Sequence, residues 1–489
     1  MSQIPAKKVL PPHTRYDSDF ADEKLIRAML AAPKADNGLV HDIIAKTKEN
    51  REALEPAEAA ALLSVDDPEL LEEMFAAAAA VKKAVYDNRV VTFAPLYCSN
   101  YCVNNCVYCG FRSGNGQSVR RALTQDEVRR ETEVLCGQIG HKRLVSVYGE
   151  HPDYGADYIA QTMSTIYSVK VPVRSGIGQI RRVNVNAAPM TVDELKTVKA
   201  AGIGTFQVFQ ETYDRDLYAR LHPGGTPKSD FRWRLYALHR AFEAGIDDVA
   251  IGALFGLGDW KFEVLGLLLH ARDLEKTFGV GPHTVSFPRL ENACGSALKN
   301  KHQVSDADFK KLVAVLRLCI PYAGMIVTAR ETPEVIRSVI AMCTQRDAST
   351  RIGIGAYSDR YTEQESERQQ FLLGDTRPLD AVIAELAEMG HITSFCTSGY
   401  RCGRTGDHIM KMLKSGHEGR FCKLNAVLTF REWLNDFASD STKAAGEKLI
   451  ARELAEIRAA LGTAYTPEIF NQLLQYQERI NKGERDLCF

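Results

Sequence analysis

The hydrophobic pattern between residues 90 and 357 repeats one arrangement eight times. A short run of apolar and β-branched residues, typical of a buried strand, precedes a longer segment whose apolar residues recur at helical spacing. The strands predicted in this way cover residues 90–97, 143–151, 180–188, 204–212, 248–257, 283–290, 324–331 and 350–357. The pattern therefore predicts strands and helices in alternation over most of the chain.

The predicted helices also carry recognisable ends. Thr124 and Thr191 each stand three residues before a glutamate, which is the spacing of a capping box, and Ser305 begins a helix in the same way. Glycines in "AAGIGT", "EAGIDD" and "TFGVGP" end helices just before the next strand. These signals support the alternation independently of hydrophobicity.

Eight successive strand–helix units favour an α/β fold, a (β/α)8 barrel of the TIM type. An open, doubly wound sheet is the alternative, because the order of strands in a sheet cannot be read from sequence. A barrel would place its chemistry at the carboxyl ends of the strands. The segment 97–116, "YCSNYCVNNCVYCGFRSGNG", follows the first predicted strand directly, so we expect it at that rim.

The flanks differ from the barrel region, and we predict three domains. Residues 1–85 show only helical periodicity and form a helical N-terminal extension. Residues 86–390 form the barrel. Residues 391–489 form a mostly helical C-terminal domain that contains cysteines at its start.

Composition narrows the classes of function. The 489 residues carry a net charge of −1, and no basic tract could neutralise many phosphates, so we expect no nucleic acid partner. No signal-peptide apolar region and no run of about 18 apolar residues is visible. We therefore expect a cytoplasmic protein without a membrane partner.

Twelve cysteines are spread unevenly along the chain. In a reducing compartment, dense groups of cysteines indicate metal or redox sites rather than disulfides. We expect the isolated ones to be small buried side chains; these are Cys136, Cys294, Cys319, Cys343 and Cys488.

The first dense group contains CxxxCxxC, formed by Cys102, Cys106 and Cys109. A structural zinc site usually closes with four ligands, and no second cysteine pair follows nearby. Three thiolates on a four-iron cube would leave one iron open to another ligand. Zinc, or packing of the cysteines without a metal, remains the alternative. Cys98 lies outside this spacing, and we expect it to be a buried side chain at the end of the strand.

CxxxCxxC resembles the signature of the radical S-adenosylmethionine (SAM) superfamily. The resemblance implies a [4Fe-4S] cluster whose open iron binds SAM, and cleavage of SAM to a 5′-deoxyadenosyl radical. Tyr108 stands where the superfamily places an aromatic residue near the adenine. Gly149 and Glu150 resemble its "GGE" element. The remaining cofactor-binding candidates are the glycines of "IGALFGLGDW", Gly252 and Gly256.

A closer resemblance covers the chain from about residue 80 onward. "APLYCSNYCVNNCVYCGF", "VFQETYDRDLYARLHPGG", "VTARE" and "SFCTSGYRCGRTG" resemble the radical SAM tyrosine lyases of [FeFe]-hydrogenase maturation, relatives of thiamine-pathway 2-iminoacetate synthase. The resemblance implies cleavage of the Cα–Cβ bond of L-tyrosine to p-cresol and dehydroglycine, then conversion of dehydroglycine to CO and cyanide. It also implies a ferredoxin or flavodoxin as electron donor and other hydrogenase maturation proteins as partners.

Substrate and cofactor residues can be placed on this basis. Arg330 at the end of the seventh strand is our first candidate to hold the carboxylate of tyrosine, and Arg289 is the second. The alternative is an arginine that only pairs with an acid such as Glu331. We expect cofactor or substrate contacts at the end of the fourth strand from Gln207, Gln210, Glu211 and Tyr213.

The resemblance implies a second, C-terminal iron–sulfur cluster with an extra iron, but this chain departs from the family pattern. Cys396 and Cys422 match the outer ligands, whereas Gly399 replaces the middle cysteine and Cys402 follows it. Cys402 could substitute, the cluster could be absent, or two thiolates could hold it with an external ligand. We expect His270 to bind the extra iron, with His283 as second choice.

Three functions follow from these alternatives. A working second cluster predicts the hydrogenase maturase, and its absence predicts a 2-iminoacetate synthase, which needs only the first. A non-catalytic iron–sulfur scaffold is the third, although it would not need the "GE" element at the end of the second strand.

Overall fold

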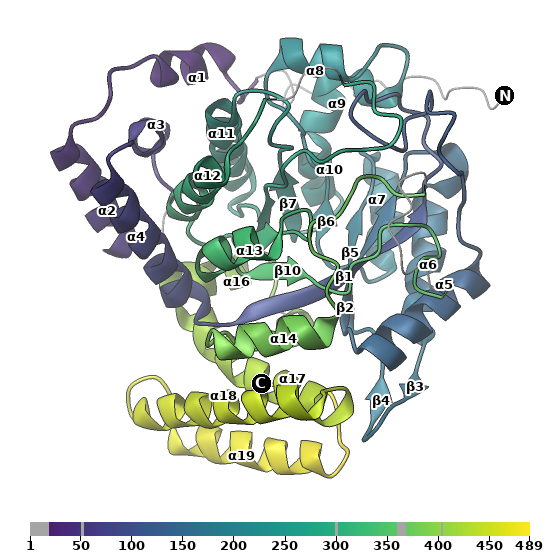
Figure 1. The fold of residues 1–489 in the computed structure, drawn as a ribbon, viewed down its shortest axis with the longest axis vertical. Coiled ribbons are helices and arrows are strands. Elements are labelled where there is room, and N and C mark those ends of the chain that lie inside the picture. Colours follow the sequence, from purple (N-terminus) through teal and green to yellow (C-terminus); the bar gives the residue numbers. More distant parts are fainter. Residues whose placement is uncertain (1–18, 50–52, 299–301, 359–367, 402–403) are drawn as a thin grey trace.

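The computed structural model describes residues 19–49, 53–298, 302–358, 368–401 and 404–489. Its centre is a closed barrel of eight parallel strands, in which β10 pairs with β1 to complete the ring (Figure 1). The barrel strands are β1 (Val90–Ser99), β2 (Arg143–Tyr148), β5 (Arg182–Asn186), β6 (Phe206–Gln207), β7 (Val249–Gly252), β8 (Thr284–Ser286), β9 (Gly324–Val327) and β10 (Gln345–Asp347). The predicted barrel is confirmed.

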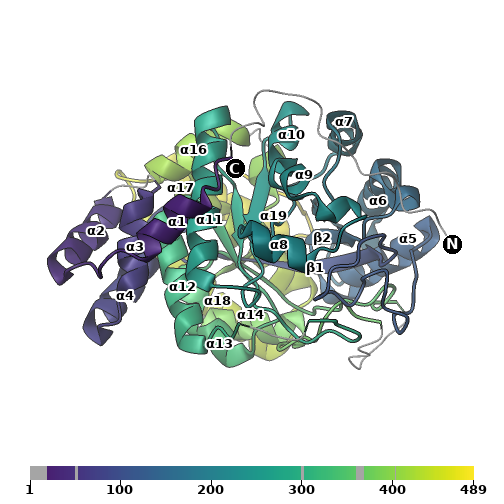
Figure 2. The ribbon, with the colours of Figure 1, turned by 90° about the horizontal axis from the view of Figure 1, so that it is seen from above.

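Helices surround the barrel and cover its strands (Figure 2). They are α5 (Gln125–Glu133), α6 (Ala156–Ser168), α7 (Val192–Ala200), α8 (Arg215–Leu221), α9 (Phe231–Leu235), α10 (Ala237–Glu243), α11 (Trp260–Phe278), α12 (Asp306–Cys319), α13 (Pro333–Val339) and α14 (Leu379–Glu388). The capping boxes at Thr124 and Thr191 are confirmed. Gly279 ends α11 with a φ of 73°, a left-handed conformation that favours glycine.

The eighth strand is the one strand that the sequence misplaced. Residues 350–357 form turns, and β10 lies earlier, at Gln345–Asp347. Its side chains are polar but buried, because Arg346 pairs with Asp375 at 3.0 Å and Asp347 accepts a hydrogen bond from the Ala329 amide at 2.7 Å. A buried strand that satisfies polar side chains in this way has no apolar run to reveal it.

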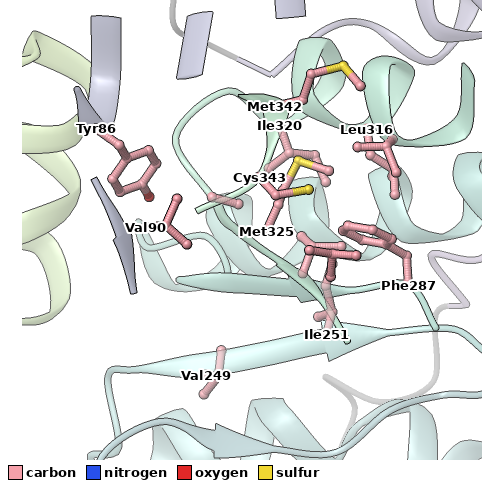
Figure 3. Packing of buried hydrophobic residues seen from close by; sticks show 14 of the residues in the cluster. Tyr86, Val90, Val249, Ile251, Phe287, Leu316, Ile320, Met325, Met342 and Cys343 are labelled. Carbon is pink, nitrogen blue, oxygen red and sulfur yellow. The ribbon is translucent and has the colours of Figure 1, made fainter. Parts of the chain in front are cut away.

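The hydrophobic core lies between the barrel and its outer helices. Figure 3 shows Met325 and Ile251, from β9 and β7, packed toward Leu316 of α12. Cys343 and Met342 lie in the same layer. Cys98, Cys136 and Cys319 are also buried, as expected, whereas Cys294 and Cys488 are only partly buried because they lie in loop and terminal segments.

Helices at both ends of the chain pack outside this core. The N-terminal set is α1 (Glu23–Leu30), α2 (Asn37–Glu49), α3 (Pro56–Ser64) and α4 (Pro68–Tyr86). Helices α1, α3 and α4 contact α11 or α12, and α2 packs on α3 and α4. The C-terminal segment contains β11 (Thr393–Ser394), α15 (Ser398–Arg401), α16 (Gly406–Ser415), α17 (His417–Asp436), α18 (Asp440–Ala459) and α19 (Pro467–Asn481). In Figure 1, α18 and α19 lie together below the barrel. A short hairpin pairs β3 (Val171–Pro172) with β4 (Ile177–Gly178).

No helix in the part of the chain that the structure describes is long and apolar enough to cross a membrane.

Candidate active site

The loop that follows β1 carries the CxxxCxxC cysteines and is tied to the end of β2. The Val103 amide donates to the Glu150 carbonyl at 2.8 Å, and Asn104 Nδ2 donates to Glu150 Oε2 at 2.7 Å. Gly149 allows this approach, because a Cβ there would lie 2.2 Å from the Tyr101 carbonyl oxygen. Glu150 is thus held beside the cysteine loop by its own side chain and backbone.

The three thiols of this loop line one cavity. Burial raises the pKa of Cys102, and it raises the pKa of Cys106 to about 12. The Phe111 amide donates to Cys109 Sγ at 3.4 Å, and Gln370 Nε2 donates to the same sulfur at 3.6 Å. Buried thiols that receive N–H donors become stable thiolates when a metal replaces their protons.

The ligand types in this cavity bear on which metal group the cysteines would fit. Cys102, Cys106 and Cys109 line the same cavity, and the described residues that line it include no fourth cysteine and no histidine. A structural zinc site usually closes with four such ligands, whereas three thiolates on a four-iron cube leave one iron open. The donor set therefore fits the cluster.

Tyr108 and Glu211 lie beside the cysteines. The Tyr108 hydroxyl is 2.9 Å from His222 Nε2, and Lys228 Nζ lies 5.6 Å from the Tyr108 ring centroid. Glu211 has a φ of 72°, which is costly for a residue other than glycine. Its carboxylate binds Lys228 Nζ at 2.7 Å and lies 3.4 Å from Arg234 Nη2.

This cationic pair controls the charge of Glu211. Burial alone would raise the pKa of the Glu211 carboxyl, but Lys228 and Arg234 lower it to about 2. Glu211 is therefore ionised at neutral pH, and the triad leaves one net positive charge in the cavity wall.

Arg330 and Arg289, the two candidate carboxylate ligands, have different surroundings. Arg330 lines the cavity with its guanidinium 3.4 Å from the centroid of the Phe371 ring, and it forms no hydrogen bond or ion pair with the residues whose positions are described. Arg289 forms two hydrogen bonds from Nε to the Glu331 carboxylate, at 2.9 and 3.0 Å, and one from Nη1 to Asp306 at 2.8 Å. The expected pairing with Glu331 thus occurs at Arg289.

One cavity connects these groups across the carboxyl ends of the strands. It holds about 1560 Å³ of space, including the part open to solvent. The predicted site residues that line it are Cys102, Cys106, Tyr108, Cys109, Gly149, Glu150, Gln207, Glu211 and Arg330. Phe93, Phe111, Phe209 and Phe371 give one part of its wall an apolar character.

The sequence interpretation missed several polar residues of the cavity. They are Tyr97, Asn104, Lys228, Arg234, Asp347, Thr350 and Gln370. Asn104 had a positional signal, since it stands inside the cysteine motif. Lys228 and Arg234 come from the segment between α8 and α10, where no motif distinguishes them from surface cations.

Other predicted residues lie outside this cavity. Gly252 lets the Phe209 ring pack closely, because a Cβ there would lie 2.6 Å from its Cδ1, and Gly256 has a φ of 108°. Tyr213 faces away and bonds His270 Nδ1 at 2.8 Å. The buried Gln210 is also absent from the residues that line the cavity.

The two histidines proposed for the extra iron lie in different surroundings. His270 is enclosed by Tyr213, the Phe20 ring at 5.0 Å and the His239 ring at 6.1 Å, so its expected reach toward the base of the barrel is not observed. His283 directly precedes β8 and interacts with Asp248, which precedes β7. It therefore lies at the amino-terminal rim.

The C-terminal cysteines lie near that same rim. Arg143, the first residue of β2, donates from Nη1 to the Cys396 carbonyl at 3.2 Å. Cys422 belongs to α17 and is buried, and the neighbouring Cys396 helps to raise the pKa of its thiol. Cys402 lies outside the described residues. The structure thus brings two of the three predicted ligands together.

Comparison with known proteins agrees with this geometry. The model of the radical SAM superfamily matches residues 96–267, and that of the biotin and thiamin synthesis associated domain matches residues 286–392. The 2-iminoacetate synthase of Salmonella typhimurium is 30% identical over 333 residues, which are 68% of this chain and 84% of that protein.

Two solved structures are similar over nearly the whole chain. A crystal structure of HydG, a maturase of the [FeFe]-hydrogenase, is 46% identical with a TM-score of 0.90, covering 96% of this chain and 100% of that one. HydG from Carboxydothermus hydrogenoformans is 36% identical with a TM-score of 0.76, covering 94% and 96%.

The barrel and its cysteine loop define a radical SAM enzyme, a class that uses a [4Fe-4S] cluster and SAM. Within that class, the chain belongs to the family of the [FeFe]-hydrogenase maturase HydG, which is related to 2-iminoacetate synthase.

Proposed function

We propose that this chain is a radical SAM lyase that cleaves the Cα–Cβ bond of L-tyrosine, giving p-cresol and dehydroglycine. The observation that carries the proposal is the position of Arg330. Its guanidinium lines the same cavity as the three cysteines, and no described acid forms an ion pair with it. An arginine whose N–H groups form no described hydrogen bond is suited to bind a carboxylate through two parallel hydrogen bonds.

The other residues of the cavity suit the rest of tyrosine. Phe93, Phe111 and Phe209 offer apolar surface for an aromatic ring and exclude water from it. Polar groups along the wall, such as the Tyr97 hydroxyl, which donates to Gln370 Oε1 at 3.0 Å, can orient the polar ends of the substrate. A zwitterionic aromatic amino acid thus matches both the charge and the shape of the wall.

Cys102, Cys106 and Cys109 are the residues that would hold the cluster, with Glu150 beside them for SAM. A cluster held there would supply the electron that cleaves SAM and so generates the radical that attacks the substrate. Asn104 positions Glu150, and the triad of Glu211, Lys228 and Arg234 forms the wall beside Tyr108. These residues bind and orient, and the apolar wall keeps solvent away from reactive species.

A second candidate is the same reaction without further conversion, as in 2-iminoacetate synthase. Gly399 favours it, because glycine cannot replace a thiolate ligand of the second cluster. Both candidates share the tyrosine lyase step and differ in whether dehydroglycine continues to CO and cyanide.

The test is product analysis after anaerobic reconstitution with iron and sulfide. Incubation with L-tyrosine, SAM and dithionite should give p-cresol and 5′-deoxyadenosine in amounts that rise together. Absence of p-cresol, with 5′-deoxyadenosine still formed, would reject tyrosine as the substrate. Release of CO, detected by haemoglobin binding, would separate the maturase from the 2-iminoacetate synthase.

A further inference from the structure

The C-terminal cysteine site contains a carboxylate at the position that the missing cysteine leaves empty. Glu418 and Cys422 are four residues apart in α17, so they share one face of the helix. The Cys422 thiol donates to Glu418 Oε1 at 3.3 Å. Glu418 therefore lies beside one of the two remaining sulfur ligands.

The same carboxylate lies close to Gly399, the position where the family pattern has its middle cysteine. A Cβ placed on Gly399 would lie 3.6 Å from Glu418 Oε1 and 3.5 Å from Arg404 Nε, which is ordinary van der Waals contact. A cysteine at 399 would thus direct its sulfur into the space that Glu418 borders. The backbone at Gly399 therefore leaves space for a cysteine side chain, and the Glu418 carboxylate borders that space.

One oxygen of the Glu418 carboxylate receives no hydrogen bond from the described residues. This oxygen is Oε2, and Glu418 is only 4% exposed. Arg404 Nε, its ion-pair partner, stands 3.4 Å from Oε2, while the Nη atoms of Arg404 donate to the Phe489 carbonyl at 3.1 and 3.2 Å. A buried carboxylate oxygen without a donor has a lone pair available for a metal.

The surroundings supply positive charge for an anionic ligand set. Arg89 is buried and interacts electrostatically with Cys422, Cys396 and Glu418. Cys396 has a φ of 47°, and its backbone is held on both sides, by Arg143 on its carbonyl and by Ser394 Oγ on its amide at 3.1 Å. Its position is therefore fixed before any metal binds.

We propose that Glu418 replaces the missing thiolate, so that Cys396, Cys422 and Glu418 together hold a C-terminal iron–sulfur cluster. On binding, the Cys396 and Cys422 thiols each lose one proton and form a bond to iron, and a carboxylate oxygen of Glu418 forms the third. The Cys422 proton leaves to solvent, which frees Glu418 Oε1 from its present hydrogen bond.

The proposal does not depend on tyrosine cleavage, because it can be tested in a full-length chain that lacks the first cluster. That chain carries Cys102→Ala, Cys106→Ala and Cys109→Ala, and is reconstituted anaerobically with iron and sulfide. We expect about four irons and four acid-labile sulfides per chain, on the stoichiometry of a cube. A chain that binds no iron overturns the proposal.

Two further variants of the triple-alanine chain identify the oxygen ligand. Glu418→Gln keeps the shape of the side chain but removes a strong ligand, so bound iron should fall at least fivefold. Cys402→Ala is the matched control and should keep its iron. Retention of iron in Glu418→Gln, with loss in Cys402→Ala, would assign the third ligand to Cys402 and overturn the proposal.

A ligand exchange provides a readout that a structural role for Glu418 would not change. Glu418→Cys should retain iron and gain thiolate-to-iron absorption in the visible spectrum. Because thiolate is a softer ligand than carboxylate, a chelator such as EDTA should remove iron at least fivefold more slowly from Glu418→Cys than from the parent. Equal rates and unchanged spectra would show that position 418 does not ligate the iron.

Discussion

At the scale of single residues, the charged side chains in and near the cavity differ in whether they form ion pairs. Glu211 is held by Lys228 and Arg234, and Arg289 is held by Glu331 and Asp306. Arg330 contacts the face of Phe371 instead. An aromatic face stabilises a guanidinium without consuming its N–H donors. Arg330 therefore keeps N–H donors that no described residue uses, as the proposed binding of a substrate carboxylate requires.

Arg330→Lys should weaken tyrosine binding. Lysine keeps the charge but loses the planar pair of donors, so the KM for tyrosine should rise about tenfold to a hundredfold, the loss of one or two charge-assisted hydrogen bonds. Binding of SAM in the absence of tyrosine, measured by the change in the electron paramagnetic resonance spectrum of the reduced cluster, should stay the same. Arg337→Lys, at an exposed position of α13, is the control. An unchanged KM would assign the substrate carboxylate elsewhere.

At the scale of elements, sequence reasoning worked where hydrophobicity and caps agree, and failed where polar groups are buried. Seven strands and the capped helices were predicted because apolar runs mark them. β10 was missed because Arg346 and Asp347 are buried through pairing. The cysteine motif located the site, since all its ligands are local. Lys228 and Arg234 could not be foreseen, because only the fold brings them to Glu211.

The loop after β6 is held by a buried carboxyl on α11. Glu263 Oε2 accepts from the Tyr213 amide at 2.8 Å, and Glu263 Oε1 accepts a short hydrogen bond from Thr212. These two residues follow Glu211 directly. Burial raises the pKa of Glu263 to about 8. A helix behind the barrel thus fixes the backbone at the edge of the cavity.

Glu263 should make stability depend on pH. The folded protein keeps the proton up to pH about 8, whereas the unfolded chain loses it near 4.5, so protons are released on unfolding between these values. The free energy of unfolding should therefore fall as pH rises from about 4.5 to about 8, by on the order of a few kcal/mol. Glu263→Gln should remove that part of the slope.

Urea unfolding of the metal-free chain at pH 5.5 and pH 8.5 measures this effect. The difference between the two pH values should be smaller in Glu263→Gln than in the parent. Identical differences in the two proteins would show that Glu263 titrates normally.

At the scale of the whole molecule, one buried carboxylate joins the C-terminal helices to the barrel. Glu432 of α17 is fully buried, and its Oε2 lies 2.8 Å from Arg181 Nη2 and 3.3 Å from Lys142 Nζ. Its Oε1 accepts from the Asp486 amide at 2.6 Å. A single side chain thus connects the barrel, α17 and the end of the chain.

Glu432→Ala should loosen this attachment. Removing one partner of a buried ion pair leaves uncompensated charge, so the free energy of unfolding should fall by about 3–5 kcal/mol. Glu447→Ala removes the partner of Arg431 at a partly exposed pair and should cost less than about 1 kcal/mol. Urea unfolding compares the two variants, and equal losses would contradict the role given to Glu432.

The position of β1 in the sheet has a consequence for synthesis of the chain. β1 pairs with β2, β10 and β11, and the last two are made about 250 to 300 residues after it. At a translation rate of about 5–20 residues per second, one edge of β1 stays open on the ribosome for on the order of tens of seconds. This edge is unpaired during that interval, so we expect iron to reach the loop after β1 only once β10 and β11 have been made.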